Sequence, residues 1–200
     1  MKAIILLIVL TISHFSFSQA PIKRGIYKSL EEIRDNQPSD SLTFKIYSET
    51  KWVGGSIKGR EETFFKLYIN NKQAREMGNI QGFSDGTKLY VAPIKLNPSK
   101  NKSLFSETFR VNDSIRIFRS LYWVKSSISV GGATGTLNTS YTSTSDFSLN
   151  FNGSINLLTV EYLEELLERD PVLYDKFQKE RSKEGLLQLY FLKLLSDGKY

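Results

Sequence analysis

Few residues in this sequence can do chemistry near neutral pH. The 200 residues include no cysteine and a single histidine, His14, which lies inside an apolar N-terminal segment. If that segment is removed, the remaining chain contains neither imidazole nor thiol. Such a chain cannot form a Ser-His-Asp triad, a Cys-His dyad, a zinc finger or an imidazole-bearing metal site. Acid–base chemistry would then fall to Asp, Glu, Lys and Tyr side chains.

A pair of carboxylates is the strongest remaining candidate for catalysis, because a glycosidase needs only two carboxyl groups facing each other across a cleft. The candidates outside predicted helix surfaces are Asp85, Glu107, Asp113 and Asp146. Asp85 and Asp113 also lie in predicted turns, where aspartate has a sufficient structural role. We therefore assign no catalytic, cofactor-binding or metal-binding residue from the sequence and expect no cofactor.

Two other patterns resemble functional motifs only superficially. Ser48-Glu49-Thr50-Lys51 has the S-x-x-K spacing of a Ser-Lys dyad, but it ends an alternating strand and has no companion motif. Residues 54–60 are rich in glycine and basic, but the Lys-Ser/Thr pair of a phosphate-binding P-loop is missing. Both patterns indicate local structure rather than catalysis.

Residues 1–18 have the composition of a secretory signal peptide. Met1-Lys2 is a short basic start, residues 3–12 are almost entirely aliphatic, and small residues precede a cut ahead of Gln19. The apolar run is shorter than the roughly 20 residues that span a bilayer. We expect an exported mature chain without a transmembrane anchor, in the periplasm, at the outer-membrane surface or outside the cell.

Basic residues gather in the middle of the chain. Residues 86–125 carry eight basic and two acidic side chains, whereas residues 159–200 carry seven basic and nine acidic ones. A basic segment favours an anionic partner such as a lipid head group or an acidic glycan, and its alternative interpretation is a solvated sheet surface. Another envelope protein is also a possible partner, and we expect no nucleic acid because the chain is exported.

Alternating apolar residues and turn signals predict a series of strands. Single strands are predicted over 42–50 and 63–69. Hairpins are predicted over 80–91 around Asp85-Gly86, over 108–124 around Asn112-Asp113, and over 147–157 around Asn152-Gly153. On the second arm of the middle hairpin, Arg119 interrupts an apolar face, so it lies at an edge, is paired, or is set off by a bulge.

The segment 126–145 differs from its surroundings because it is rich in Ser, Thr and Gly and carries no charge. Such low complexity predicts a loop, with a ragged hairpin as the alternative.

Helices are predicted at both ends of the mature chain. Ser29, with Glu32 three residues later, has the spacing of a capping box for a short helix. Residues 72–77 fit one helical turn. Residues 159–200 predict two or three helices, with Thr159 as a cap, Asp170-Pro171 as a second start and Gly185 as a break.

The predicted fold class is α+β: a short N-terminal helix, an antiparallel sheet of about six to eight strands, and a C-terminal pair or trio of helices. The predicted boundaries are 1–18 for the signal peptide and 19–158 for a β-rich domain containing the loop 126–145. Residues 159–200 are a helical segment of the same domain.

Three stretches resemble a group of uncharacterised exported proteins from Bacteroidetes-type bacteria. They are Gly25 through Ser39, Gly82 through Val91, and Leu158 through Tyr174 with its Asp170-Pro171 start. That group has no known activity, so the resemblance implies export and overall organisation rather than a reaction.

The sequence therefore predicts a non-enzymatic exported protein that binds or supports something at the cell envelope. The alternatives are a carboxylate-dependent envelope enzyme acting on a glycan and a peripheral membrane-surface protein using the basic middle segment. Ser41 and Ser114 each follow an aspartate and precede an aliphatic residue, the short pattern of O-glycosylation acceptors in such bacteria. An Asx turn at each aspartate is the favoured interpretation.

Overall fold

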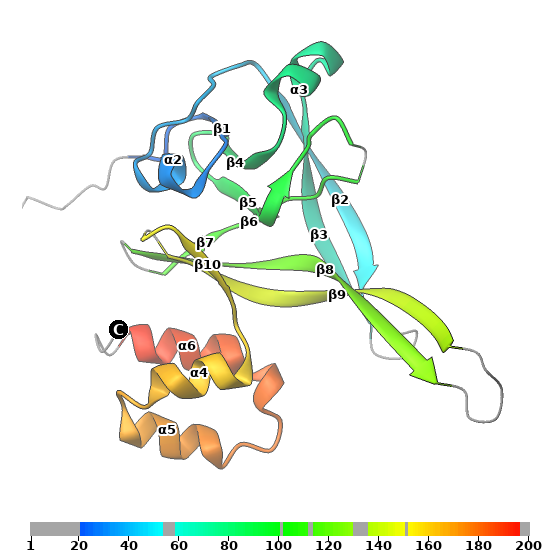
Figure 1. Cartoon of the computed structure of the whole chain (residues 1–200). Coiled ribbons are helices and arrows are strands. Elements are labelled where there is room, and N and C mark those ends of the chain that lie inside the picture. The colour runs from blue at the N-terminus through cyan, green and yellow to red at the C-terminus, as the bar shows by residue number, and fades with distance from the viewer. Residues whose placement is uncertain are drawn as a thin grey trace, which may run out of the picture.

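Two antiparallel four-stranded sheets, a separate two-stranded ribbon and a group of C-terminal helices make up the fold (Figure 1). The computed structural model describes residues 21–53, 59–100, 102–111, 114–129, 136–150 and 152–196. In chain order the elements are β1 (Gly25–Tyr27), α2 (Leu30–Arg34), β2 (Lys45–Val53), β3 (Arg60–Tyr68), α3 (Asn71–Met77), β4 (Ile80–Ser84), β5 (Leu89–Leu96), β6 (Ser106–Glu107), β7 (Phe109–Arg110), β8 (Ile115–Ser129), β9 (Thr136–Asn150), β10 (Ser154–Leu157), α4 (Val160–Leu167), α5 (Pro171–Gln178), the 3₁₀ turn η1 (Lys183–Gly185) and α6 (Leu187–Ser196).

The α+β class is confirmed, but the single predicted sheet is corrected to three. The first sheet has the order β1-β4-β5-β6, the second has the order β10-β9-β8-β7, and β2 pairs only with β3. Alternating residues identify the strands and their hairpins. They do not identify which hairpins share a ladder, because that depends on contacts between distant segments.

The interpretation of 126–145 as a loop is corrected as well. Within that segment, residues 126–129 end β8 and residues 136–145 belong to β9, and the two strands pair in unbroken register from Ile115↔Asn150 to Ser129↔Thr136. Threonine is β-branched and favours extended backbone, so a polar Thr-rich segment can continue a ladder that apolar residues begin. The hairpin alternative fits these residues.

The turn between β4 and β5 also differs from its prediction. Ser84 pairs with Leu89, so four residues rather than two connect the strands. A type I′ turn needs positive φ at both central residues, but here Gly86 (φ 99°) alone has it and Asp85 does not. The Asp-Gly pair therefore marks the hairpin correctly but not its turn type.

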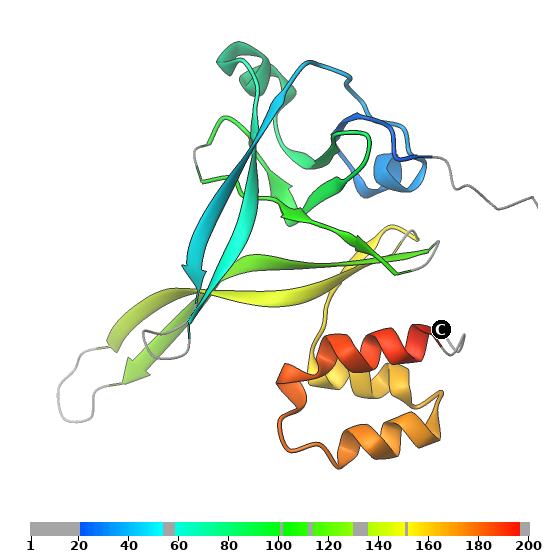
Figure 2. The same ribbon diagram turned by 180° about the vertical axis from the view of Figure 1, so that it is seen from behind.

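The second sheet is the middle layer of the molecule. Ile115 and Ile117 of β8 point to one face and join the buried cluster of the C-terminal helices, in which α4 and α6 lie nearer the sheet and α5 packs beyond them (Figures 1 and 2). Phe118, Phe147 and Leu149 point to the other face and pack with Tyr27 and Val91 of the first sheet. This burial on both faces explains why apolar residues at both odd and even positions occur around residue 117.

The C-terminal helices begin at the predicted caps. The Thr159 hydroxyl accepts a hydrogen bond from the Tyr162 amide at 3.1 Å, and an Asp170 carboxylate oxygen accepts one from the Leu173 amide at 3.2 Å. Gly185 lies in η1, between α5 and α6. At the other end of the chain, the Ser29 hydroxyl caps α2, but the Glu32 carboxylate accepts from the Lys28 amide instead of completing a capping box with Ser29.

Candidate functional site

A basic pocket of about 460 Å³ opens where α2, the β4–β5 turn and the β6–β7 corner meet the beginning of β8. We define the basic pocket by the polar lining residues Arg34, Asn36, Thr87, Lys88, Glu107, Thr108, Arg110 and Arg116, with Pro21, Ile22, Ile33 and Phe109 as its apolar lining.

The end of α2 fixes one wall of the basic pocket. The Gln37 amide donates to the Glu32 carbonyl at 2.9 Å and the Asn36 amide donates to the Ile33 carbonyl at 3.2 Å, which is the Schellman pattern. Asn36 has the left-handed backbone (φ 52°) that this pattern requires. Its side chain holds the preceding chain in place, since Oδ1 accepts from the Lys23 amide at 2.8 Å.

The β4–β5 turn places Lys88 on a second wall. Asp85 Oδ1 accepts hydrogen bonds from the Thr87 amide at 2.8 Å and the Lys88 amide at 2.7 Å, and from the Thr87 hydroxyl at 2.8 Å. Burial opposes the charged form of Asp85, but the hydrogen bonds from Lys88 and Thr87 outweigh it and lower the pKa of this carboxyl. Asp85 is therefore a structural acceptor that shapes the pocket.

Replacing Asp85 by alanine is expected to lower the free energy of unfolding by about 1 kcal/mol at pH 7. The lowered folded-state pKa stabilises the fold at pH values above the ordinary carboxyl value of 3.8, and this contribution disappears as the pH falls through the folded-state pKa. Urea denaturation at pH 7, 4 and 2.5 should therefore show a shrinking difference from the wild type. Asp175→Ala, on the exposed side of α5, is the matched loss of one charge and should change the free energy of unfolding at pH 7 by less than about 0.5 kcal/mol.

Cationic side chains dominate the basic pocket. Arg34, Lys88, Arg110 and Arg116 line it, and Glu107 is the one carboxylate in the described lining. Glu107 lies 3.0 Å from Lys88 Nζ. Arg116 Nη1 donates to the Thr108 hydroxyl at 3.2 Å, while burial and the neighbouring Arg110 lower the pKa of Arg116. An anion entering the pocket would relieve this repulsion between two like charges.

A second hollow, of about 740 Å³, lies between β9 and the helices α4 and α6. Arg119 lies on its rim and binds Asp146 through two hydrogen bonds, Nε to Oδ1 at 2.6 Å and Nη2 to Oδ2 at 2.8 Å. Arg119 Nη1 also approaches Glu62 Oε1 of β3 at 3.4 Å. Of the three possibilities left open for Arg119, the pair is confirmed, and it joins β8, β9 and the β2–β3 ribbon. The unbroken register excludes a bulge, and because β7 pairs only with Arg116 and Ile117 among the described residues, β8 is also an edge strand at Arg119.

The structure does not assemble the candidate carboxylates into one acidic cleft. Asp85 supports a turn, Glu107 faces Lys88, and Asp146 is held by Arg119. Asp113 lies outside the described residues. The second hollow has other acidic lining residues, Glu161 and Glu184, but the carboxylate of Asp146 is committed to its arginine.

The structure gives no support for a catalytic or phosphate-binding role of the S-x-x-K pattern or the glycine-rich segment in the residues that it describes. Ser48 and Lys51 are three residues apart on a strand, so their side chains point to opposite faces, and Lys51 pairs with Glu49 at 3.1 Å. Residues 54–58 of the glycine-rich segment are not among the described residues. Asp40 Oδ1 accepts from the Leu42 amide at 2.9 Å, which is the Asx turn expected beside Ser41.

Sequence reasoning found part of the basic pocket. Lys88, Arg110 and Arg116 belong to the basic middle segment, but Arg34 lies at the end of α2 and Asn36 just after it, and the sequence did not connect these two residues with that segment. The available signal was the position of Arg34 in the last turn of a short helix that ends before Pro38. That signal locates the helix end but not its neighbour in space.

The described ranges contain neither a cluster of metal ligands nor a membrane-spanning helix. No group of three or more Asp, Glu, His or Cys residues there could hold a metal ion. Within the same ranges, no helix has the length and apolar character needed to cross a bilayer.

A family model described as a family of unknown function, DUF6563, matches residues 25–199. The chain belongs to this family. No curated protein and no solved structure matches the chain. The DUF6563 span includes every lining residue of the basic pocket except Pro21 and Ile22, and it includes the C-terminal helices. The match confirms the prediction that the chain belongs to an uncharacterised family. It assigns no function, so the function must be argued from the site.

Proposed function

We propose that this chain is an exported, non-enzymatic binding protein of a bacterial cell envelope, and that the basic pocket holds an anionic group of its partner. The observation that carries this proposal is the charge of the pocket lining, which holds four cationic side chains and one carboxylate. Lys88 lies beside that carboxylate and Arg34 pairs with Asp35. Burial and the nearby Arg110 lower the pKa of Arg116. A concave surface with this imbalance attracts anions, and its field is strongest where protein rather than water surrounds the charges.

The chemistry of the lining suits an oxyanion. Arginine presents a planar fork of donors that matches the oxygens of carboxylate, sulfate or phosphate groups. Three of the four cations are arginines, and Thr87 and Thr108 add hydroxyl groups. The lining does not supply two opposed carboxylates among its described residues, so a binding function fits it better than glycoside hydrolysis does.

Export is supported by the sequence alone. Residues 1–18 have the basic start, apolar centre and small-residue exit of a signal peptide, and they lie outside the described residues. The remaining chain is free of cysteine and histidine, and three of its stretches resemble exported proteins of Bacteroidetes-type bacteria. An anionic envelope component, such as an acidic glycan or a lipid head group, is the partner that fits both location and charge.

The test is anion binding by the chain without residues 1–18. Polygalacturonate, inorganic phosphate, and vesicles of phosphatidylglycerol or phosphatidylcholine are offered in separate titrations. We expect saturable binding to at least one anionic probe and at least tenfold weaker binding by Arg110→Glu. Lys72→Glu, on the exposed surface of α3, makes the same charge change outside the pocket and should bind as the wild type does.

The outcomes separate the sources of the anionic group. A preference for polygalacturonate indicates an acidic glycan, and a preference for phosphatidylglycerol over phosphatidylcholine indicates a head group. Failure to bind any anionic probe, or equal weakening by both charge reversals, would contradict the proposal. Turnover of the glycan would contradict its non-enzymatic part.

A further inference from the structure

The two faces of the β2–β3 ribbon have different roles. On one face, Val53 and Phe64 are buried against the rest of the molecule, and Glu49 pairs with Lys51 and Lys66. On the other face, in the half of the ribbon next to its connecting loop, the side chains are exposed and almost all hydrophilic. The one large apolar side chain among them is Trp52.

Trp52 is held in place although it is exposed. A Cβ atom added at Gly59 would lie 2.2 Å from the indole Nε1 and 2.4 Å from Cε2, so the ring lies directly against the backbone of Gly59. The side chain nevertheless remains 60% exposed. One side of the indole therefore lies against glycine and another is open to solvent, and a residue larger than glycine at position 59 would force the ring to move.

Hydrogen-bonding groups surround this ring on the same face. Trp52 is directly opposite Glu61 in the β2–β3 register, and Thr50 is opposite Thr63 two positions further along. All four side chains are exposed. Glu61 makes no ion pair with any described residue, in contrast to its neighbour Glu62, which binds Arg60 and Arg119. We define Thr50, Trp52, Gly59, Glu61 and Thr63 as the Trp52 platform.

We propose that the Trp52 platform binds a neutral sugar ring, at a site separate from the basic pocket. The apolar face of a pyranose is comparable in size to an indole, and a ring already fixed on glycine loses little conformational freedom when a ligand stacks on it. The Glu61 carboxylate and the two threonine hydroxyls can accept hydrogen bonds from sugar hydroxyls.

The same charges argue against other occupants. Glu61 repels a polyanion such as nucleic acid or an acidic glycan. A cationic ligand would be attracted by Glu61, but recognition of quaternary ammonium groups uses cages of several aromatic rings, and this platform offers one. A neutral sugar is the ligand that uses both the open ring and the acceptors beside it.

The experiment uses Trp52 as its own reporter. Trp123 is the other tryptophan of the chain, so Trp123→Phe leaves Trp52 as the single indole. Neutral hexasaccharides of glucose, N-acetylglucosamine, mannose and xylose are titrated into this variant while its fluorescence is recorded. We expect a saturable change with at least one of them, and calorimetry should give the same affinity with the unsubstituted chain.

Variants of the platform decide whether the site is correct. Trp52→Ala should remove the calorimetric signal, Gly59→Ala should weaken binding at least tenfold by displacing the indole, and Glu61→Gln should weaken it severalfold. Lys72→Gln, outside the platform, should bind normally. Absence of a saturable signal with all four sugars, binding of choline instead, or unchanged affinity in Trp52→Ala would overturn the proposal.

The two proposed sites can fail independently. Arg110→Glu should leave sugar binding unchanged, and Trp52→Ala should leave binding of the anionic probes unchanged. Loss of both activities in either variant would show that the platform is not a separate site.

Discussion

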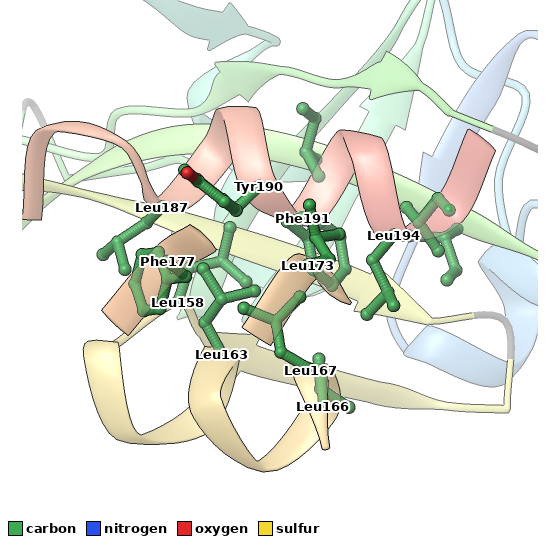
Figure 3. Close-up of a cluster of buried hydrophobic side chains, with 13 residues drawn as sticks. Leu158, Leu163, Leu166, Leu167, Leu173, Phe177, Leu187, Tyr190, Phe191 and Leu194 are labelled. Atoms are coloured by element: carbon green, nitrogen blue, oxygen red, sulfur yellow. The ribbon is translucent and has the colours of Figure 1, made fainter. Parts of the chain in front are cut away.

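Replacement of Phe191 by alanine is expected to lower the free energy of unfolding by about 3–5 kcal/mol. Phe191 is fully buried, and it points from α6 into the cluster that α4 and α5 share with β8 (Figure 3). The substitution removes a large apolar side chain and leaves a cavity that packed neighbours fill only in part. The measurement is urea denaturation followed by circular dichroism, with the midpoint and slope compared to the wild type.

Leu192→Ala is the matched control for this substitution. Leu192 is the next residue of α6, but it is 38% exposed, so its loss should cost less than about 1 kcal/mol. Because Ile115 and Ile117 of the second sheet belong to the same cluster, unfolding should remain a single transition in both variants. Equal effects at the two positions, or separate melting of the helices, would refute the packing and the prediction that residues 159–200 belong to the same domain as the sheets.

The C-terminal helices were predictable because their signals are local. Thr159 and Asp170-Pro171 identify helix starts through chemistry within one turn of the chain, and leucines at helical spacing identify the buried face. The hairpin positions were predictable for the same reason. Local patterns identify an element, and sometimes its burial, without knowledge of its neighbours.

The arrangement of the sheets was not predictable because it depends on distant contacts. The alternating pattern of β2 and β3 is no different from that of strands in larger sheets, yet in the described residues the two strands form a ladder only with each other, and β3 adds a single bridge from Phe65 to Phe105. The Ser/Thr-rich half of β9 was harder still to predict as a strand. Its own sequence does not by itself indicate a strand, and its strand conformation depends on hydrogen bonding to β8. Low complexity describes composition and does not determine backbone conformation.

In the candidate sites, too, local features were predictable from the sequence and contacts between distant segments were not. The sequence indicated a basic middle segment but not the pocket, because the pocket exists only where α2 meets β7 and β8. It placed Trp52 and Gly59 within or beside a glycine-rich connection, but contact between them depends on hairpin geometry across residues 53–59. The types of the site residues were therefore visible from the sequence, whereas their proximity in the folded chain was not.

Replacement of Arg119 by alanine is expected to lower the free energy of unfolding by about 2–3 kcal/mol, below the range for fully buried pairs because Arg119 is partly exposed. The side chain of Asp146 is 14% exposed and that of Arg119 is 32% exposed. Removing the arginine leaves a mostly buried carboxylate without its two strongest hydrogen bonds. Guanidinium or urea denaturation at fixed ionic strength is the measurement.

A double-mutant cycle distinguishes this specific pair from a general effect of charge. Arg119→Ala with Asp146→Ala should cost about 1–2 kcal/mol less than the sum of the single changes, because the double variant contains no stranded carboxylate. Arg34→Ala removes a cation from an exposed pair with Asp35 and should leave the midpoint unchanged. Additive effects of the two substitutions would mean that Arg119 and Asp146 do not stabilise each other. If the cycle shows coupling and Glu62→Gln also destabilises the fold, Arg119 connects β8, β9 and the β2–β3 ribbon. The ribbon that carries Trp52 is then held to the second sheet through Arg119.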